Sequence, residues 1–280
     1  MMTITDLYLI SPEISLAMLA SLVIVLDLMT DRKSLVQSLA FAGLLAPLIA
    51  CFLLWGELES WWNLISPVTG EVTGESIPAM TQSIVVDRFS LFFKFLILAT
   101  VGLVILSSQE YIEKFRNYAG EYFSLILLST IGMMVLVSSV ELIPLYIALE
   151  LSALPLVALS AFLGDSKSSE AGLKFLLLAA LSSAVLLYGL VLIFGVTGTT
   201  HLELISSQVV HGSEWGGSPI LLLGVILLIA GFGFKIATVP FQMWVPDVYE
   251  GSPTSVTSFF ALVPKIAAIS VFIRFMYVPF

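Results

Sequence analysis

Eight long apolar segments are the feature that most constrains how this chain can fold. A helix that crosses a bilayer needs about 20 mostly apolar residues, whereas a strand of a membrane β-barrel has about 10 residues of alternating polarity. The apolar runs here are long and do not alternate, as LLLGVILLIA at residues 221–230 illustrates. We therefore predict an all-α, polytopic membrane protein of about eight transmembrane helices. The segments are residues 8–29, 36–55, 87–107, 122–139, 142–163, 171–195, 218–244 and 253–279.

The composition agrees with this class and argues against others. Hydrophobic residues make up 59% of the chain and charged residues 11%, whereas soluble domains carry roughly 25% charged residues. The net charge is −9 and no basic cluster is present, which makes nucleic acid a poor partner. The chain has one cysteine, its two histidines show no ligand spacing, and it has no dinucleotide-binding loop. We expect a lipid bilayer around the chain and no redox cofactor or metal within it.

Loop charges predict the orientation of the chain. If the helices alternate in direction, five basic residues fall on one side of the membrane, and two long acidic loops without lysine or arginine, residues 56–86 and 196–217, fall on the other. Lysine and arginine mark the cytoplasmic side. The N-terminus is therefore predicted outside. The five basic residues are Arg32, Lys33, Lys114, Arg116 and Lys167.

Three ionisable residues fall near the middle of three different predicted helices. They are Glu150, Lys235 and Lys265. At 1.5 Å per residue, the two lysines lie roughly 15 and 18 Å from the inner ends of their helices. A charge at mid-helix costs at least ~2.5–3.5 kcal/mol, and a lysine stem is too short to reach water from there. One carboxylate does not neutralise two lysines, and a poorly paired buried lysine loses its proton readily. The pattern indicates an ion pathway, and a structural ion pair inside the bundle is the alternative.

For other charged residues, a position at the surface or at the membrane interface is an interpretation that requires no function. Lys174 lies near the start of its helix, four residues after Glu170, so a surface pair of the favourable i,i+4 order is an alternative to a functional role. Lys94 is expected to snorkel toward the interface. Glu13 and Asp27, near the two ends of the first helix, are expected to reach the interface as well.

The segment between the last two predicted helices is rich in proline. Pro240 and Pro246 remove backbone donors, and Pro240 is expected to break the helix five residues after Lys235. Irregular backbone at membrane depth is tolerated only where it is buried in protein or lines water. Broken helices near charges form midplane sites in transporters. Pro264, directly before Lys265, predicts a second distortion.

This segment carries a family resemblance. Residues 234–254, FKIATVPFQMWVPDVYEGSPT, resemble the hallmark of the antiporter-like membrane subunits of respiratory complex I, the NADH–quinone oxidoreductase. The PDVYEGSP part, PKIA at residues 264–267 and EAGLKF at residues 170–175 resemble subunit N of that complex. The resemblance implies that residues 122–280, helices four to eight, form one antiporter-like unit with a broken seventh helix. Residues 1–121 then hold the first three helices and an outer loop.

The resemblance also implies roles for individual residues. Glu150 would set the pKa of nearby lysines, Lys174 and Lys235 would carry protons, and Lys265 would pass them laterally. The chain would be a translocase subunit in a prokaryotic plasma membrane, beside other membrane subunits of complex I, with NAD and quinone used elsewhere in the complex. The family's second, inverted unit is absent here, so the chain is expected to be the N-terminal part of such a subunit.

Two other interpretations remain open. A subunit of a multisubunit sodium/proton antiporter or of a membrane-bound hydrogenase shares the same five-helix unit and the same use of lysine. The second interpretation is a membrane scaffold whose charges are purely structural. In that case, neutralising Glu150 and Lys235 would leave ion movement unchanged.

Overall fold

A computed structural model of the protein describes residues 4–30, 33–57, 77–79, 83–109, 118–211 and 218–277. The described residues contain 8 helical segments that are long and apolar enough to cross a membrane, two of which, Lys33–Gly56 and Pro219–Gly251, are interrupted. This confirms the predicted polytopic helical class. A short antiparallel hairpin, which the sequence did not predict, pairs Ile77 with Val86 and Ala79 with Ile84. The elements are α1 (Ile4–Leu9), α2 (Ser11–Met29), α3 (Lys33–Gly43), α4 (Leu45–Glu57), β1 (Ile77–Ala79), β2 (Ile84–Val86), α5 (Arg88–Ser107), α7 (Ala119–Ser138), α8 (Leu142–Ser160), α9 (Ser166–Thr197), α10 (Leu202–His211), α11 (Pro219–Ile236), η2 (Phe241–Trp244), α12 (Val245–Gly251) and α13 (Thr254–Tyr277).

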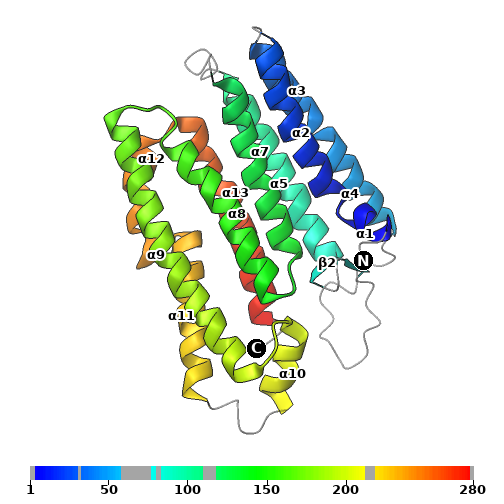
Figure 1. Cartoon of the computed structure of the whole chain (residues 1–280), viewed down its shortest axis with the longest axis vertical. Helices are drawn as coiled ribbons and strands as arrows, with labels where there is room; N and C mark the ends of the chain where they lie inside the picture. The colour runs from blue at the N-terminus through cyan, green and yellow to red at the C-terminus, as the bar shows by residue number, and fades with distance from the viewer. Residues whose placement is uncertain are drawn as a thin grey trace.

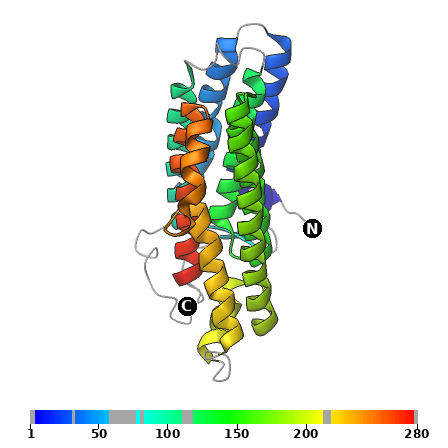
Figure 2. The same ribbon diagram turned by 90° about the vertical axis from the view of Figure 1, so that its left-hand side faces the viewer.

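The long helices run up and down one elongated bundle (Figures 1 and 2). The end of α2, the start of α3, the α8–α9 connection and α12 lie at one end of the bundle, and α1, β2, α10 and the end of α13 lie at the other (Figure 1). Lys33 and Lys167, which stand at the starts of α3 and α9, therefore share one end of the bundle, as alternation requires. Which end faces the cytoplasm stays a prediction, and Arg32, Lys114 and Arg116 lie outside the described residues.

Side-chain caps fix where two of the long helices begin. Asp87 precedes α5 and accepts a hydrogen bond from the Ser90 backbone N–H at 2.7 Å, and Ser90 returns the capping contact. Asp165 accepts one from Ser168 N–H at 2.7 Å, so α9 begins five residues before the predicted start. Such caps satisfy the unpaired donors of the first helical turn. Asp87 is also held by another helix, since Arg274 Nη2 lies 2.9 Å from its Oδ1.

Small residues set how closely the helices approach. A Cβ on Gly132 of α7 would lie 2.5 Å from the Ser152 backbone nitrogen of α8, and one on Gly189 of α9 would lie 2.8 Å from the Gly224 carbonyl oxygen of α11. Ser129 donates a hydrogen bond to the Ser152 carbonyl at 2.8 Å across the same α7–α8 contact. Helices in lipid associate by close backbone packing and interhelical hydrogen bonds of this kind.

Two charged residues, Lys94 and Glu13, do not lie where the sequence predicted. Lys94 is 1% exposed and does not snorkel, because its Nζ lies 2.6 Å from Oε1 of Glu13 on α2. Glu13 is 5% exposed and Asp27 9% exposed, and Asp27 pairs with Lys33 at 3.0 Å. The expectation that Lys94 and Glu13 reach the interface was wrong because each finds a partner on another helix, which removes the need for water. For Asp27, near the end of α2, it stays a prediction.

A carboxylate ties three connections together at the α10 end of the bundle. Glu141, between α7 and α8, accepts hydrogen bonds from Ser83 beside β2 and from Thr200 Oγ1 at 2.6 Å, and its backbone pairs with His201. Burial raises the pKa of the Glu141 carboxyl, but the two hydroxyl donors and the charge of His201 lower it more, and its pKa lies below the usual value.

The sign of this shift predicts how the connections respond to pH. A carboxyl with a lowered pKa in the folded state stabilises the protein above its unfolded pKa and loses that contribution as pH falls through the folded pKa. We expect acid to increase amide hydrogen exchange around residues 83–86 and 200–202 in the unsubstituted protein. We expect Glu141→Gln to show this increase already at neutral pH and to lose its dependence on acid. Exchange measured by mass spectrometry in nanodiscs checks this. Glu203→Gln, at an exposed carboxylate of α10, is the matched control and should leave both regions unchanged.

Candidate functional site

The predicted helix break lies directly after Lys235. α11 ends at Ile236, Ala237 adopts a left-handed conformation with φ 63°, and the chain turns through Pro240 into the short 3₁₀ helix η2 before α12 begins at Val245. Pro246 occupies the first turn of α12, where a missing N–H costs little. The prediction of a broken seventh helix is confirmed.

The backbone freed by the break is satisfied within the protein. The Phe234 carbonyl accepts hydrogen bonds from the Ala237 N–H at 3.1 Å and from the Trp244 indole at 3.1 Å, and the Gly233 carbonyl accepts one from the Thr238 N–H at 2.9 Å. Unpaired carbonyls at a helix end inside a membrane are costly. Trp244 therefore acts as a side-chain cap that folds η2 back onto the end of α11.

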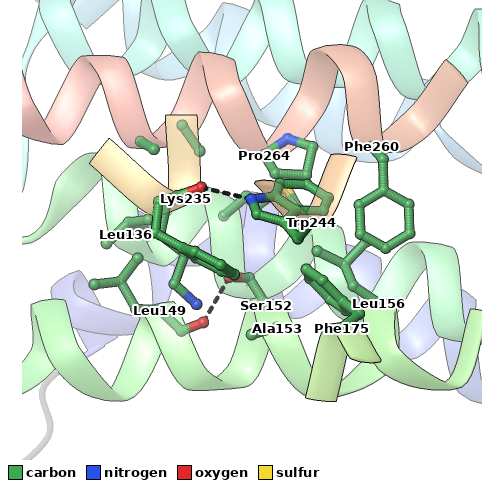
Figure 3. Close-up of a pocket in the computed structure, with 14 residues that line it drawn as sticks. Leu136, Leu149, Ser152, Ala153, Leu156, Phe175, Lys235, Trp244, Phe260 and Pro264 are labelled. Atoms are coloured by element: carbon green, nitrogen blue, oxygen red, sulfur yellow. Dashed lines mark hydrogen bonds between the residues drawn. The ribbon is translucent and has the colours of Figure 1, made fainter. Parts of the chain in front are cut away.

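Lys235 lines a small pocket beside the break (Figure 3). The pocket is formed by residues of α7, α8, α9, α11, η2 and α13; Lys235 is the one charged residue in its lining and Ser152 the one hydroxyl. Its volume is about 30 Å³, enough for one or two water molecules, since one water needs ~10–15 Å³. In Figure 3 the Lys235 side chain extends across the pocket toward Leu149 and Ser152 of α8. An ammonium group is thus held in a largely apolar cavity between packed helices.

Glu150 lies on α8, one residue after Leu149 of the pocket lining. It accepts a hydrogen bond from the Ser183 hydroxyl of α9 and interacts electrostatically with Lys235. Among the described residues, the close ion pairs do not include Glu150, Lys235 or Lys265. The structure thus brings the predicted carboxylate and the predicted lysine near one another without joining them in a direct salt bridge.

Lys265 lies on the other side of Pro264, a pocket residue that interrupts the backbone hydrogen bonding of α13. Its Nζ lies 5.9 Å from the centroid of the Tyr249 ring, and that ring lies 6.1 Å from the Trp244 ring. Cations are attracted to the faces of aromatic rings at such distances. The Tyr249 ring therefore contacts both the Lys265 ammonium and Trp244, which lines the pocket.

Three polar atoms around α12 are buried and have no hydrogen-bond partner within the described part of the chain. They are Gln242 Oε1, Tyr249 Oη and Ser252 Oγ, which belong to the segment between the pocket and Lys265. Buried polar groups are normally paired with protein or with ordered water. Three such atoms close in sequence indicate a place where water molecules complete the hydrogen bonding.

Lys174 lies outside the pocket. Its Nζ is 2.7 Å from Glu170 and 2.8 Å from Asp247 of α12, and its side chain is 44% exposed. The predicted Glu170–Lys174 pair therefore exists, extended by an acidic residue that the sequence did not suggest. The next residue, Phe175, is the one from α9 that lines the pocket. The proton-carrying role of Lys174 stays a prediction.

Sequence reasoning missed three contributors to the site. Ser183, the partner of Glu150, is an ordinary helical serine in the sequence, and Trp244 looks like an interfacial aromatic residue. The third, Tyr249, lies inside the resembling segment, but no sequence signal pointed to a role for it. Only helix packing reveals them. Within the described ranges, no group of three or more His, Cys, Asp or Glu residues is arranged to hold a metal ion.

This chain is similar in sequence and in fold to known proteins. Residues 139–280 match the family described as "NADH:quinone oxidoreductase/Mrp antiporter, TM". Subunit N of the NADH-quinone oxidoreductase of Moorella thermoacetica is 42% identical over 96% of this chain, and that of Rhodospirillum rubrum is 40% identical over 96%. Each match covers 52% of the relative. The chain spans about half the length of the curated relatives it matches.

Chains of solved membrane complexes have a similar structure. A chain of respiratory complex I from Thermus thermophilus is 30% identical, with a TM-score of 0.74, and the match covers 94% of this chain and 52% of that one. A chain of an archaeal membrane-bound sulfane sulfur reductase also has a TM-score of 0.74, at 23% identity, and shares the fold alone. The arrangement of helices around the broken element is therefore one that several membrane complexes use.

Proposed function

The chain belongs to the NADH:quinone oxidoreductase/Mrp antiporter transmembrane family, and from that premise we propose that it is proton-translocating, as part of a subunit N of an NADH–quinone oxidoreductase. The observation that carries the proposal is Lys235, an ammonium held in a mostly apolar pocket at a helix break, with Glu150 in electrostatic range. NAD and quinone are substrates of other subunits in this proposal, and neighbouring membrane subunits are the partners of the chain. Its location is a prokaryotic plasma membrane, with the N-terminus outside.

Protons move in this mechanism by small changes in electrostatic balance. Lys235 holds a proton at Nζ while Glu150 is negative and close. When Glu150 moves away or gains a partner, the charged form of Lys235 becomes less favourable, and its proton leaves through water near Gln242 and Tyr249 toward Lys265. The aromatic ring of Tyr249 stabilises Lys265 in its charged form. Lys174, tethered by Glu170 and Asp247, would supply protons from the end of the bundle at which α12 lies.

The energies involved are adequate for transport. Two unit charges about 4 Å apart interact by ~4 kcal/mol at an effective dielectric constant near 20, and one pKa unit corresponds to about 1.4 kcal/mol. Moving one charge against 100 mV costs ~2.3 kcal/mol. A change of a few ångströms between Glu150 and Lys235 is therefore enough to load or release a proton against a membrane potential.

Neutralising Glu150 tests the electrostatic role of the carboxylate. We expect Glu150→Gln to lower proton translocation severalfold with little loss of assembly, because the amide oxygen still accepts the hydrogen bond from Ser183 while the charge that acts on Lys235 is gone. Quenching of a pH-sensitive dye in inverted membrane vesicles measures this. Ser183→Ala keeps the charge and removes the hydrogen bond, and should have the smaller effect. A larger loss in Ser183→Ala would contradict an electrostatic role for Glu150.

Association with a redox complex tests the proposed complex directly. Native membranes are solubilised mildly, separated on a native gel stained for NADH dehydrogenase activity, and probed for this chain in a denaturing second dimension. Migration of the chain with the stained complex is the expected result. A complex without that activity would instead favour the multisubunit sodium/proton antiporter.

The antiporter alternative has one specific observation in its favour. A chain of the Mrp complex of Dietzia has the same fold, with a TM-score of 0.69 at 22% identity. Sodium dependence separates the two functions, since proton movement that requires sodium on the opposite side of the vesicle supports exchange and not redox-driven pumping.

A further inference from the structure

A second cluster of buried ionisable groups lies far from the pocket, among the helices of the N-terminal part. Glu13 of α2 and Lys94 of α5 are 5% and 1% exposed, and Lys94 Nζ lies 2.6 Å from Glu13 Oε1. Cys51 of α4 is fully buried and interacts electrostatically with both. None of these residues takes part in the site around Lys235.

This ion pair is incompletely satisfied. Glu13 Oε2 is buried and has no hydrogen-bond partner among the residues that the structure describes. Lys94 has three N–H donors. In the described part of the chain, it forms one ion pair, which is the one with Glu13. A buried ion pair offsets its desolvation only when further hydrogen bonds satisfy the remaining lone pairs and protons. The pair is therefore built poorly for a purely structural role, and its protonation state responds to nearby charge.

The other ionisable groups around the pair are few. α2 packs against α1, α3, α4 and α7, and α5 packs against α3, α4, α7, α13 and β2. Of the ionisable groups on these elements, Cys51 interacts with both members of the pair. The remaining ones in the described residues are Asp6 and Tyr8 of α1, Lys33 of α3, Glu57 of α4, Glu121 and Tyr122 of α7, and Lys265, Arg274 and Tyr277 of α13, with Asp87 and Arg88 at the start of α5 and Asp27 at the end of α2.

Lys94 lies at nearly the same level of the bundle as Lys265. α5 and α13 pack together, and Asp87 at the start of α5 pairs with Arg274 near the end of α13. Measured along each helix from that pair, Lys94 is roughly 10 Å and Lys265 roughly 14 Å away at 1.5 Å per residue. The two lysines therefore differ in depth along the bundle by less than one helical turn.

We propose that Glu13 and Lys94 form a second proton-binding site of this chain, in which the free Oε2 of Glu13 takes up the proton. One proton arrives from water, an O–H bond forms at Glu13 Oε2, Lys94 keeps its three N–H bonds, and the cluster changes from neutral to one positive charge. Release reverses these steps. The binding of the proton stands on the geometry of the cluster alone, and only its coupling to Lys265 rests on the proposed function.

A double substitution separates this site from a structural ion pair. Glu13→Gln with Lys94→Met removes both charges and the titratable group but leaves no unpaired charge, so a merely structural pair predicts normal assembly and normal proton translocation. We expect the assembled double variant to translocate severalfold fewer protons per substrate turnover. Asp27→Asn with Lys33→Met, which neutralises the peripheral α2 pair, is the matched control and should leave this ratio unchanged. An unchanged ratio in the Glu13/Lys94 variant would overturn the coupling of this site to proton translocation, and proton binding itself is decided by the next measurement.

Cys51 provides a second measurement in the unsubstituted protein, independent of whether the double variant assembles. It is the one cysteine of the chain, and the S–H stretching band of a buried thiol responds to the local electric field. Infrared spectra of the native complex, taken across a pH titration and referenced to Cys51→Ala, should show a shift of that band together with a carboxylic acid signal that is absent in Glu13→Gln. A band that stays fixed while no such signal appears would refute proton binding at Glu13.

Failure of the second proton-binding site can be distinguished from failure of the proposed function. If Lys235→Met keeps full proton translocation while the infrared signal of Glu13 is present, the pathway through Lys235 fails and the second site stands. If Lys235→Met abolishes translocation and the Glu13 signal is absent, the pathway stands and the second site fails.

Discussion

Replacing Lys235 by methionine is expected to abolish proton translocation while the chain still inserts and folds. Methionine has nearly the length of the lysine stem and fills the apolar part of the pocket lined by Leu149, Phe175 and Pro264. Burying an apolar side chain where a charge was held is neutral or stabilising as often as not. The substitution should therefore leave stability largely unchanged. It should abolish proton transfer, because no other ionisable side chain of the described residues lines this pocket.

The measurement is proton uptake by inverted vesicles, normalised to the amount of assembled chain and to substrate turnover. Lys235→Arg keeps a charge that cannot be deprotonated in proteins, so it should also fail if proton release from this position is required. Lys167→Met, at an exposed lysine paired with Glu250, serves as the control and should behave like the unsubstituted chain. Normal translocation by Lys235→Met would remove this residue from the pathway.

Removing the Asp87 side chain is expected to cause a large loss of stability. Asp87 caps α5 and pairs with Arg274, which is 8% exposed. Breaking a buried ion pair from one side costs ~3–5 kcal/mol, and loss of an N-cap costs about 1 kcal/mol. Because the Asp87 side chain is 24% exposed, we expect Asp87→Ala to destabilise the protein by about 3 kcal/mol.

Related substitutions separate the two contributions. Asp87→Asn keeps an oxygen that caps α5 and removes the charge, so it should be less destabilising than Asp87→Ala by about 1 kcal/mol. Asp87→Asn combined with Arg274→Met leaves no unpaired buried charge and should recover much of the loss. Thermal unfolding in nanodiscs, followed by tryptophan fluorescence, measures all of these variants. If Asp87→Ala unfolds at the same temperature as the unsubstituted chain, the pair contributes nothing.

The stabilisation by Asp87 also depends on pH with a defined sign. Burial raises the pKa of the Asp87 carboxyl, but the charge and hydrogen bond of Arg274 and the bonds from Ser90 lower it more, so its pKa lies below the usual value. This contribution is fully present above the unfolded pKa of about 3.9 and is lost as pH falls through the lower, folded value. The stability difference between the unsubstituted chain and Asp87→Asn should therefore be constant near neutral pH and shrink in acid.

Much of the fold could be predicted from the sequence because each transmembrane helix is a local feature. Apolar length fixes the existence of each span, and a bilayer leaves helices as the one way to satisfy the backbone of such a run. Pro240 and the positions around it predicted the break after Lys235 for a similarly local reason. The β1–β2 hairpin was missed because three-residue strands carry no periodic signal.

The site was predicted only in part. Depth along a helix follows from counting residues, so Glu150, Lys235 and Lys265 were placed near the same level. Which side chains meet depends on how the helices are rotated and packed, and this is why the Ser183–Glu150 contact and the Lys174–Asp247 pair were not foreseen. The expected positions of Lys94 and Glu13 failed for the same reason.

The sequence by itself determined that this chain is a membrane protein, how many apolar segments it has and where the seventh of them breaks. Those properties depend on a single segment and its solvent. The tertiary structure alone decided which charges are partners, because Glu13 and Lys94 lie far apart in the sequence, as do the residues of α8 and α11 around the pocket. Contacts between distant segments are fixed by the close approach of glycines such as Gly132 and by the hydrogen bonds between helices, and these form only once the whole bundle has packed.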